Sequence, residues 1–129
     1  MAEIKLGLKG EATVEVTEAN STRHLGDVRV FTTPSLVALL ETACLTTVRP
    51  YLPEGQATVG VGINIRHLAA TPVGMTVRAT CELTEVKGRV LAFRVEAHDA
   101  REKIAEGTHW RAIVNIEEVV ARIRAKVQS

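Results

Sequence analysis

Residues 31–44 read FTTPSLVALLETAC, and this stretch decides the fold. Its apolar residues follow a helical period from Pro34 to about Val48, and most of the helix circumference is apolar. Threonine followed by proline is typical of a helix start, and Pro50 indicates the end. A helix with so little polar surface is expected to be buried on nearly all sides.

The segments before and after this helix in the sequence show the alternation of apolar and polar residues that is typical of strands. One strand is predicted over 12–16 and four more after Gly55, the middle two joined by a tight hairpin at Lys87 and Gly88. Residues 17–27 are interpreted as a loop, and a short amphipathic helix is predicted to close the chain. The residues expected to face inward are Ala57, Val59, Val61, Ile63, Ile65, His67, Val77, Ala79, Cys81, Leu83, Leu91, Phe93, Val95, Ala97, Ile104, Trp110, Ala112 and Val114.

One strand, a long apolar helix and four strands joined largely by short turns predict an antiparallel sheet that curls around the helix. This α+β arrangement of about five strands is the hotdog fold, and it is expected to form a single domain over residues 1–129. A cystatin-like wrap is the alternative, but its helix is normally more amphipathic.

Composition excludes several classes of function. The 129 residues carry a net charge of +1, so no basic face for nucleic acid is expected. The sequence has no apolar run suited to a signal peptide or a membrane span, which favours a cytoplasmic protein without a membrane partner.

Cys44 and Cys81 occupy apolar positions and are interpreted as buried free thiols. The four histidines lack metal-ligand spacing, and neither a metal nor a cofactor is expected.

Glu41 is the one carboxylate in the apolar helix. Burying an unpaired carboxylate costs several kcal/mol, so Glu41 must find a donor, become protonated or border a solvated cleft. A structural glutamate, paired with a backbone group or an arginine, is the alternative to a functional one.

Two further positions are candidates for chemistry. Thr33 lies at the helix start, where capping explains a threonine but where backbone N–H groups could also receive a carbonyl or an anion. His67 has the parity of the core residues, so it is either a structural histidine or a base at the open end of a strand. Gly60 and Gly62 interrupt the same strand, which indicates a bulge or a close backbone approach. Together, hydroxyl, acid and histidine could form a catalytic set.

Three motifs carry a resemblance to a known family. They are TPSLVALLE (33–41), LPEGQATVGVGINIRHLAATPVGMTVRA (52–79) and AEGTHWRAIV (105–114). Over roughly residues 12–117 the chain resembles the hotdog thioesterases of the fluoroacetyl-CoA thioesterase type.

The resemblance implies roles for five residues. It implies a catalytic set of Thr33, Glu41 and His67. It implies that the Gly60 backbone lines the thioester carbonyl and that Arg111, whose parity is outward, associates with the CoA portion. It also implies a homodimer with the active site at the subunit interface.

The expected function is hydrolysis of a short-chain acyl-CoA, with the choice of attacking group left open. A non-catalytic hotdog module that binds acyl thioesters or serves dimerisation is the alternative, and it would need neither Glu41 nor His67. A hotdog hydratase is a weaker interpretation. The fluoroacetyl enzyme has an aromatic lid in the segment before the helix, whereas residues 19–31 here have Phe31 as their one aromatic. Modest acyl selectivity is therefore expected.

Overall fold

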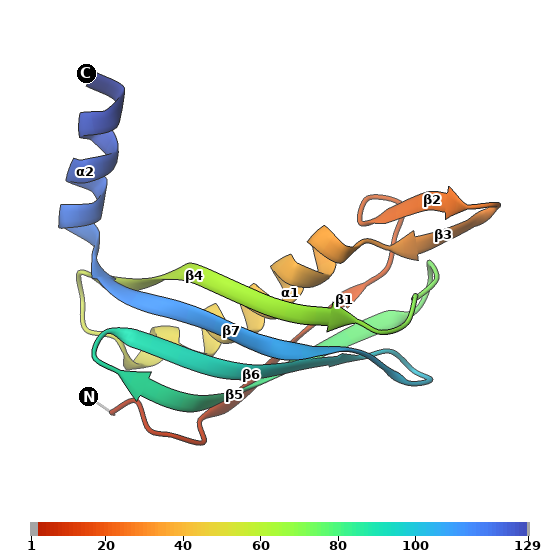
Figure 1. Cartoon of the computed structure of the whole chain (residues 1–129), viewed down its shortest axis with the longest axis horizontal. Helices are drawn as coiled ribbons and strands as arrows, with labels where there is room; N and C mark the ends of the chain where they lie inside the picture. Colours follow the sequence, from red (N-terminus) through yellow and green to blue (C-terminus); the bar gives the residue numbers. More distant parts are fainter. Residues whose placement is uncertain (1–2, 129) are drawn as a thin grey trace.

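The computed structural model describes residues 3–128. A five-stranded antiparallel sheet, in the order β1-β5-β6-β7-β4, carries the helix α1 along one face (Figure 1). The elements are β1 (Lys9–Glu15), β2 (Ser21–Leu25), β3 (Val28–Phe31), α1 (Thr33–Val48), the 3-10 turn η1 (Arg49–Tyr51), β4 (Gln56–His67), β5 (Thr76–Lys87), β6 (Val90–His98), β7 (Lys103–Asn115) and α2 (Ile116–Gln128). The predicted α+β hotdog arrangement is confirmed.

The start of α1 uses two neighbouring threonines differently. The Thr32 hydroxyl accepts a hydrogen bond from the Ser35 N–H at 3.1 Å, which makes Thr32 the N-cap. Thr33 is the first helical residue, and Pro34 follows it without an N–H to satisfy. Because Thr32 does the capping, the Thr33 hydroxyl is available for another partner.

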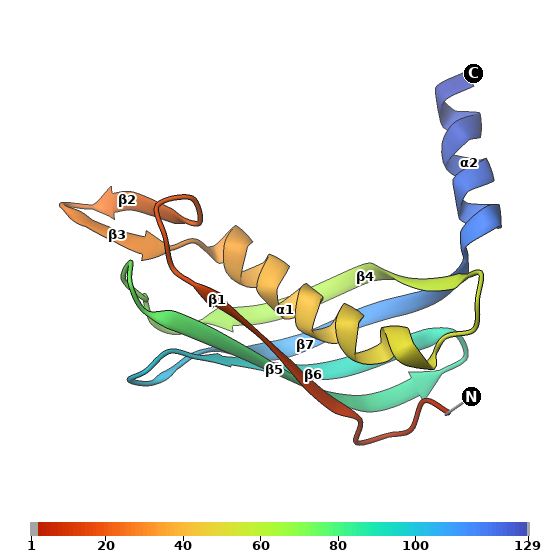
Figure 2. The same ribbon diagram turned by 180° about the vertical axis from the view of Figure 1, so that it is seen from behind.

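The sheet covers one face of α1 (Figure 2). The buried residues of the helix are Leu36, Leu39, Leu40, Ala43, Cys44 and Val48. Ala38, Thr42 and Thr46, on the opposite side, are exposed. The prediction that the helix is buried on nearly all sides is therefore wrong for this chain, because one sheet covers only one side of a helix.

Alternation predicts β5 and β6 correctly. The inward residues Val77, Ala79, Cys81, Leu83, Leu91, Phe93, Val95 and Ala97 are all buried. Lys87 pairs with Val90 across a two-residue turn, and Gly88 has the positive φ of 62° that this turn requires. The predicted hairpin is confirmed.

A β-bulge divides β4. Gly60 pairs with Arg111 and Gly62 with Trp110, so Val61 is an extra residue. The extra residue exchanges the two faces of the strand. Ile63 and Ile65 pack on the core as predicted. Before the bulge, however, Thr58 is buried and Val59 is exposed, so the predicted inward set from Ala57 to Val61 is wrong.

A second irregularity lies at the start of β7. Lys103 pairs with His98 and Ala105 with Ala97, so Ile104 is the extra residue there. The bulge puts His109 and Arg111 on the buried face. The predicted inward set of Trp110, Ala112 and Val114 is wrong, because strict alternation from Ile104 does not include the bulge.

Residues 17–27 are not a simple loop. Ser21–Leu25 pairs with Val28–Phe31 in a hairpin that extends beyond the start of α1 (Figure 2). The Arg29 Nε–H donates to the Ser21 hydroxyl at 3.0 Å and ties the two strands together. Because Ser21–Leu25 consists mostly of polar residues, the alternation of apolar and polar residues did not predict this strand.

The closing helix α2 stands away from the sheet and buries none of its residues (Figure 1). Its apolar and charged residues are segregated, as predicted. Within residues 3–128, no helix has the length and apolar character that crossing a membrane requires.

Candidate active site

Thr33 and His67 meet at the start of α1. Thr33 Oγ1 lies 2.8 Å from His67 Nδ1, although the two residues are 34 positions apart in sequence. Thr33 is the first residue of α1 and His67 is the last residue of β4. The fold therefore places a hydroxyl beside a histidine nitrogen, as a nucleophile and its base require.

The environment of His67 favours a neutral ring. Burial lowers the pKa of His67 below its ordinary value of 6.5. A neutral ring that accepts the Thr33 hydroxyl proton at Nδ1 carries its own proton on Nε2. That Nε2 atom is buried, and a hydrogen bond to the Ala69 backbone offsets part of the lowering of the His67 pKa.

A groove of about 620 Å³ lies beside this pair. Its walls are the β2–β3 hairpin, the start of α1 and the end of β4 with the residues that follow it. The apolar lining residues are Leu25, Val30, Phe31, Pro34, Leu68, Ala69 and Ala70. A largely apolar groove with a hydroxyl and an imidazole at its edge suits a small organic ligand.

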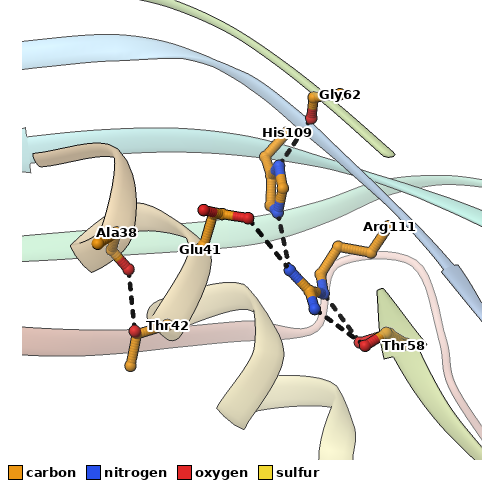
Figure 3. Close-up of polar contacts among 7 residues, drawn as sticks. All are labelled: Ala38, Glu41, Thr42, Thr58, Gly62, His109 and Arg111. Atoms are coloured by element: carbon orange, nitrogen blue, oxygen red, sulfur yellow. Dashed lines mark hydrogen bonds and ion pairs between the residues drawn. The ribbon is translucent and has the colours of Figure 1, made fainter. Parts of the chain in front are cut away.

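Glu41 lies elsewhere on α1. Glu41 is eight positions after Thr33 on the same helix, which corresponds to a rise of about 12 Å. Its side chain is 42% exposed, and Oε2 lies 3.9 Å from Nη1 of Arg111 (Figure 3). The expectation of a buried Glu41 is corrected, and this single chain does not bring Glu41 to the Thr33–His67 pair.

Gly60 makes room for Glu41. A Cβ atom built on Gly60 would lie 2.7 Å from Glu41 Oε2, closer than real Cβ contacts. The sequence predicted a close approach to the backbone at this glycine, and the group that approaches Gly60 is the Glu41 carboxylate.

Arg111 points inward, toward the helix. It is 5% exposed, donating from Nε to the Thr58 hydroxyl at 2.8 Å and from Nη2 to the Thr58 carbonyl at 3.0 Å. Burial lowers the pKa of Arg111 from its ordinary value. The predicted outward orientation is wrong, because the bulge at Ile104 exchanges the faces of β7. Its assignment to the CoA portion therefore has no support from its position.

His109, for which the sequence predicted no role, completes this second cluster. The ring is 1% exposed, with Nδ1 2.8 Å from the Gly62 carbonyl and Nε2 3.1 Å from Nη1 of Arg111 (Figure 3). Burial lowers the pKa of His109, and the charge on Arg111 lowers it further. The available signal was the spacing of His109 and Arg111, which puts both side chains on one face of a strand.

Known proteins give the family. The model of the FlK family, described as fluoroacetyl-CoA-specific thioesterase, matches residues 10–117. The fluoroacetyl-CoA thioesterase of Streptantibioticus cattleyicolor is 45% identical over 97 residues, which are 75% of this chain and 70% of that protein. A solved structure of the fluoroacetyl-CoA thioesterase FlK is 37% identical, with a TM-score of 0.90 and coverage of 97% of this chain and 98% of that one.

A further solved structure holds ligands. It is a phenylalanine-to-alanine variant of the fluoroacetyl-CoA-specific thioesterase in complex with fluoroacetate and CoA. It is 36% identical, with a TM-score of 0.83 and coverage of 90% of this chain and 99% of that one. This chain therefore belongs to the fluoroacetyl-CoA-specific thioesterase family of hotdog-fold thioesterases.

Proposed function

We propose that this protein hydrolyses short-chain acyl-CoA thioesters with Thr33, Glu41 and His67. The observation that carries the proposal is the 2.8 Å contact between Thr33 Oγ1 and His67 Nδ1 beside an apolar groove. Membership of a thioesterase family supports the same reaction, and a relative of this chain is found with fluoroacetate and CoA.

Hydrolysis adds water across the thioester, breaks the C–S bond and releases a carboxylic acid and the CoA thiol. Neutral His67 takes a proton from the attacking hydroxyl, which belongs either to Thr33 or to a water that Thr33 positions. The resulting imidazolium then protonates the departing thiolate. Glu41 either polarises the attacking group or attacks the carbonyl itself. If Thr33 or Glu41 attacks, the acyl group is bonded to that residue as an ester or an anhydride, and a water deprotonated by His67 then cleaves this bond and releases the carboxylic acid.

The developing oxyanion needs N–H donors. Ser35 donates to the Thr32 hydroxyl and Leu36 to the Thr32 carbonyl, while Pro34 has no N–H. The helix start therefore offers fewer donors than the sequence suggests, and Thr33 is the residue of this turn whose N–H can serve. The Gly60 backbone is the second donor that we assign to this role.

We further propose that the working enzyme is a homodimer with the site between subunits. The roughly 12 Å rise from Thr33 to Glu41 supports this, since a second copy can complete each half-site. The edge strand β4 also supports it, because Val59 is 39% and Val61 57% exposed. An unprotected apolar edge favours pairing with another strand. Analytical ultracentrifugation should give the mass of a dimer, and a monomer that is fully active would contradict this proposal.

The test of function is thiol release from acetyl-, propionyl-, butyryl- and fluoroacetyl-CoA. Glu41→Gln keeps the volume and much of the polarity of the side chain, yet kcat should fall by about 100-fold or more. Thr42→Ala is the matched control, because the Thr42 hydroxyl bonds to the Ala38 carbonyl of its own helix. A folded Glu41→Gln protein with unchanged turnover would exclude a catalytic Glu41. A native protein that releases no thiol from any of the four thioesters would instead favour the binding module.

A further inference from the structure

Arg111 is a buried cation held in a fixed orientation. Nε and Nη2 are both committed to Thr58, which fixes the plane of the guanidinium. Nη1 is the nitrogen that faces both His109 and Glu41. The direction of Nη1 therefore determines where the positive charge is presented to the Glu41 carboxylate.

The contacts of His109 fix its tautomer. The Gly62 carbonyl can only accept a hydrogen bond, so Nδ1 must carry a proton. The Arg111 guanidinium can only donate, so Nε2 must carry a lone pair. His109 is thus a neutral ring protonated at Nδ1, and a doubly protonated ring would place a second cation against Arg111.

The Glu41 carboxylate depends on this arrangement. Its contact with Arg111 Nη1 is 3.9 Å, an ion pair longer than a hydrogen bond. Glu41 is therefore oriented by charge and by the space at Gly60, while its oxygens are not consumed by a direct bond to Arg111. Such a carboxylate can still accept a proton or polarise a water.

We propose that His109 is a positioning residue, whose neutral Nε2 holds Nη1 of Arg111 where the guanidinium orients Glu41 for the reaction. The chain of contacts runs from the Gly62 carbonyl, at the β4 bulge, through His109 and Arg111 to Glu41. The His109 side chain is 1% exposed, so we assign its effect to its contact with Arg111 and not to the substrate. This role rests on the proposed function of Glu41.

Three substitutions separate the role from simple packing. His109→Leu removes both hydrogen bonds. We expect kcat to fall by roughly 10- to 100-fold with KM little changed, because displacing a catalytic carboxylate by about 1 Å lowers the rate by up to about 100-fold. His109→Gln can restore an acceptor for Arg111 and should recover most of the rate. His109→Asn can keep only the donor to Gly62 and should stay as slow as His109→Leu. Equal losses in all three variants would overturn the role.

The control is His98→Leu, which removes a half-buried histidine at the end of β6. Its kcat should match that of the native protein. Circular dichroism and thermal unfolding confirm that each variant is folded. A similar loss in folded His98→Leu would assign the His109 effect to general packing and overturn the proposal.

A double-mutant cycle tests whether His109 acts through Glu41. In the Glu41→Gln background, His109→Leu should cost less than about twofold, because the carboxylate it orients is already gone. Additive losses would show that His109 acts independently of Glu41, and they would overturn the proposal.

Nitrogen NMR of the imidazole rings gives a readout besides activity. At pH 7 His109 should show a protonated Nδ1 and an unprotonated Nε2, and a proton on Nε2 would overturn the proposal by itself. If Glu41→Gln is fully active, the catalytic role of Glu41 fails and the positioning role of His109 with it, whatever the tautomer. If Glu41→Gln is inactive but His109→Leu is unimpaired, the positioning role alone fails.

Discussion

The start and the middle of α1 hold functional groups in opposite ways. At the start, Thr33 and His67 touch directly at 2.8 Å beside an apolar groove. In the middle, Glu41 stands 3.9 Å from a buried arginine that other residues hold in place. A short contact aligns a proton donor with its base, whereas an ion pair beyond hydrogen-bond length orients a carboxylate without consuming its oxygens. The first arrangement depends on two residues and the second on a network.

The sharpest test of the direct contact is His67→Ala. Loss of the base should lower kcat/KM by roughly 10²- to 10⁴-fold. His98→Ala serves as the control, and its rate should be unchanged.

The pH profile adds a second test of the same contact. His67 must be neutral to act as base and its pKa is lowered by burial, so the native rate should fall only as pH drops below 6.5. This fall in rate at low pH should be absent from the residual activity of His67→Ala. If the rate of the variant still falls at low pH, another group is the base.

Gly60→Ala tests the network at its tightest point. The new Cβ would lie 2.7 Å from Glu41 Oε2, so the carboxylate must shift, and kcat should fall by about 100-fold. Gly62→Ala is the matched control in the same bulge, because its Cβ meets Trp110 at 3.4 Å, where a small adjustment suffices. Equal losses in both variants would point to the bulge itself and not to Glu41.

The groove beside Thr33 and His67 should discriminate acyl groups only modestly. Phe31 is the one aromatic of the segment 19–31, and the hairpin there borders an open groove. Exchange of one small substituent should then change kcat/KM by about 10- to 200-fold at most. The measurement compares fluoroacetyl- with acetyl-CoA after correction for intrinsic reactivity. A corrected preference of about 10⁴-fold would show that the hairpin closes the site.

The two adjacent threonines should separate stability from catalysis. Thr32→Ala removes the N-cap acceptor and should cost about 1 kcal/mol of unfolding free energy, measured by urea denaturation, with the rate largely kept. Thr33→Ala should lower the rate and leave the unfolding free energy largely unchanged, since the Thr33 hydroxyl contacts His67 and not the helix backbone. If Thr33→Ala proved the less stable of the two, the assignment of the cap would be wrong.

The sequence by itself determined the long helix, the alternation of β5 and β6 and the hairpin at Gly88. In these elements the signal is local, because helix period, strand period and turn chemistry all lie within a few neighbouring residues. It also nominated Thr33 and His67, whose contact needs only a helix start and a strand end at the same end of the sheet. Whether they and Glu41 catalyse a reaction stays a prediction.

Tertiary structure alone decided the second cluster. Val61 and Ile104 are extra residues only with respect to the strands they pair with, and each exchanges the faces of everything that follows it. A count along one strand therefore put Arg111 outside and gave His109 no role, whereas pairing buries both and turns them toward α1. The exposure of Glu41 was likewise decided by packing, because one sheet covers only one face of α1.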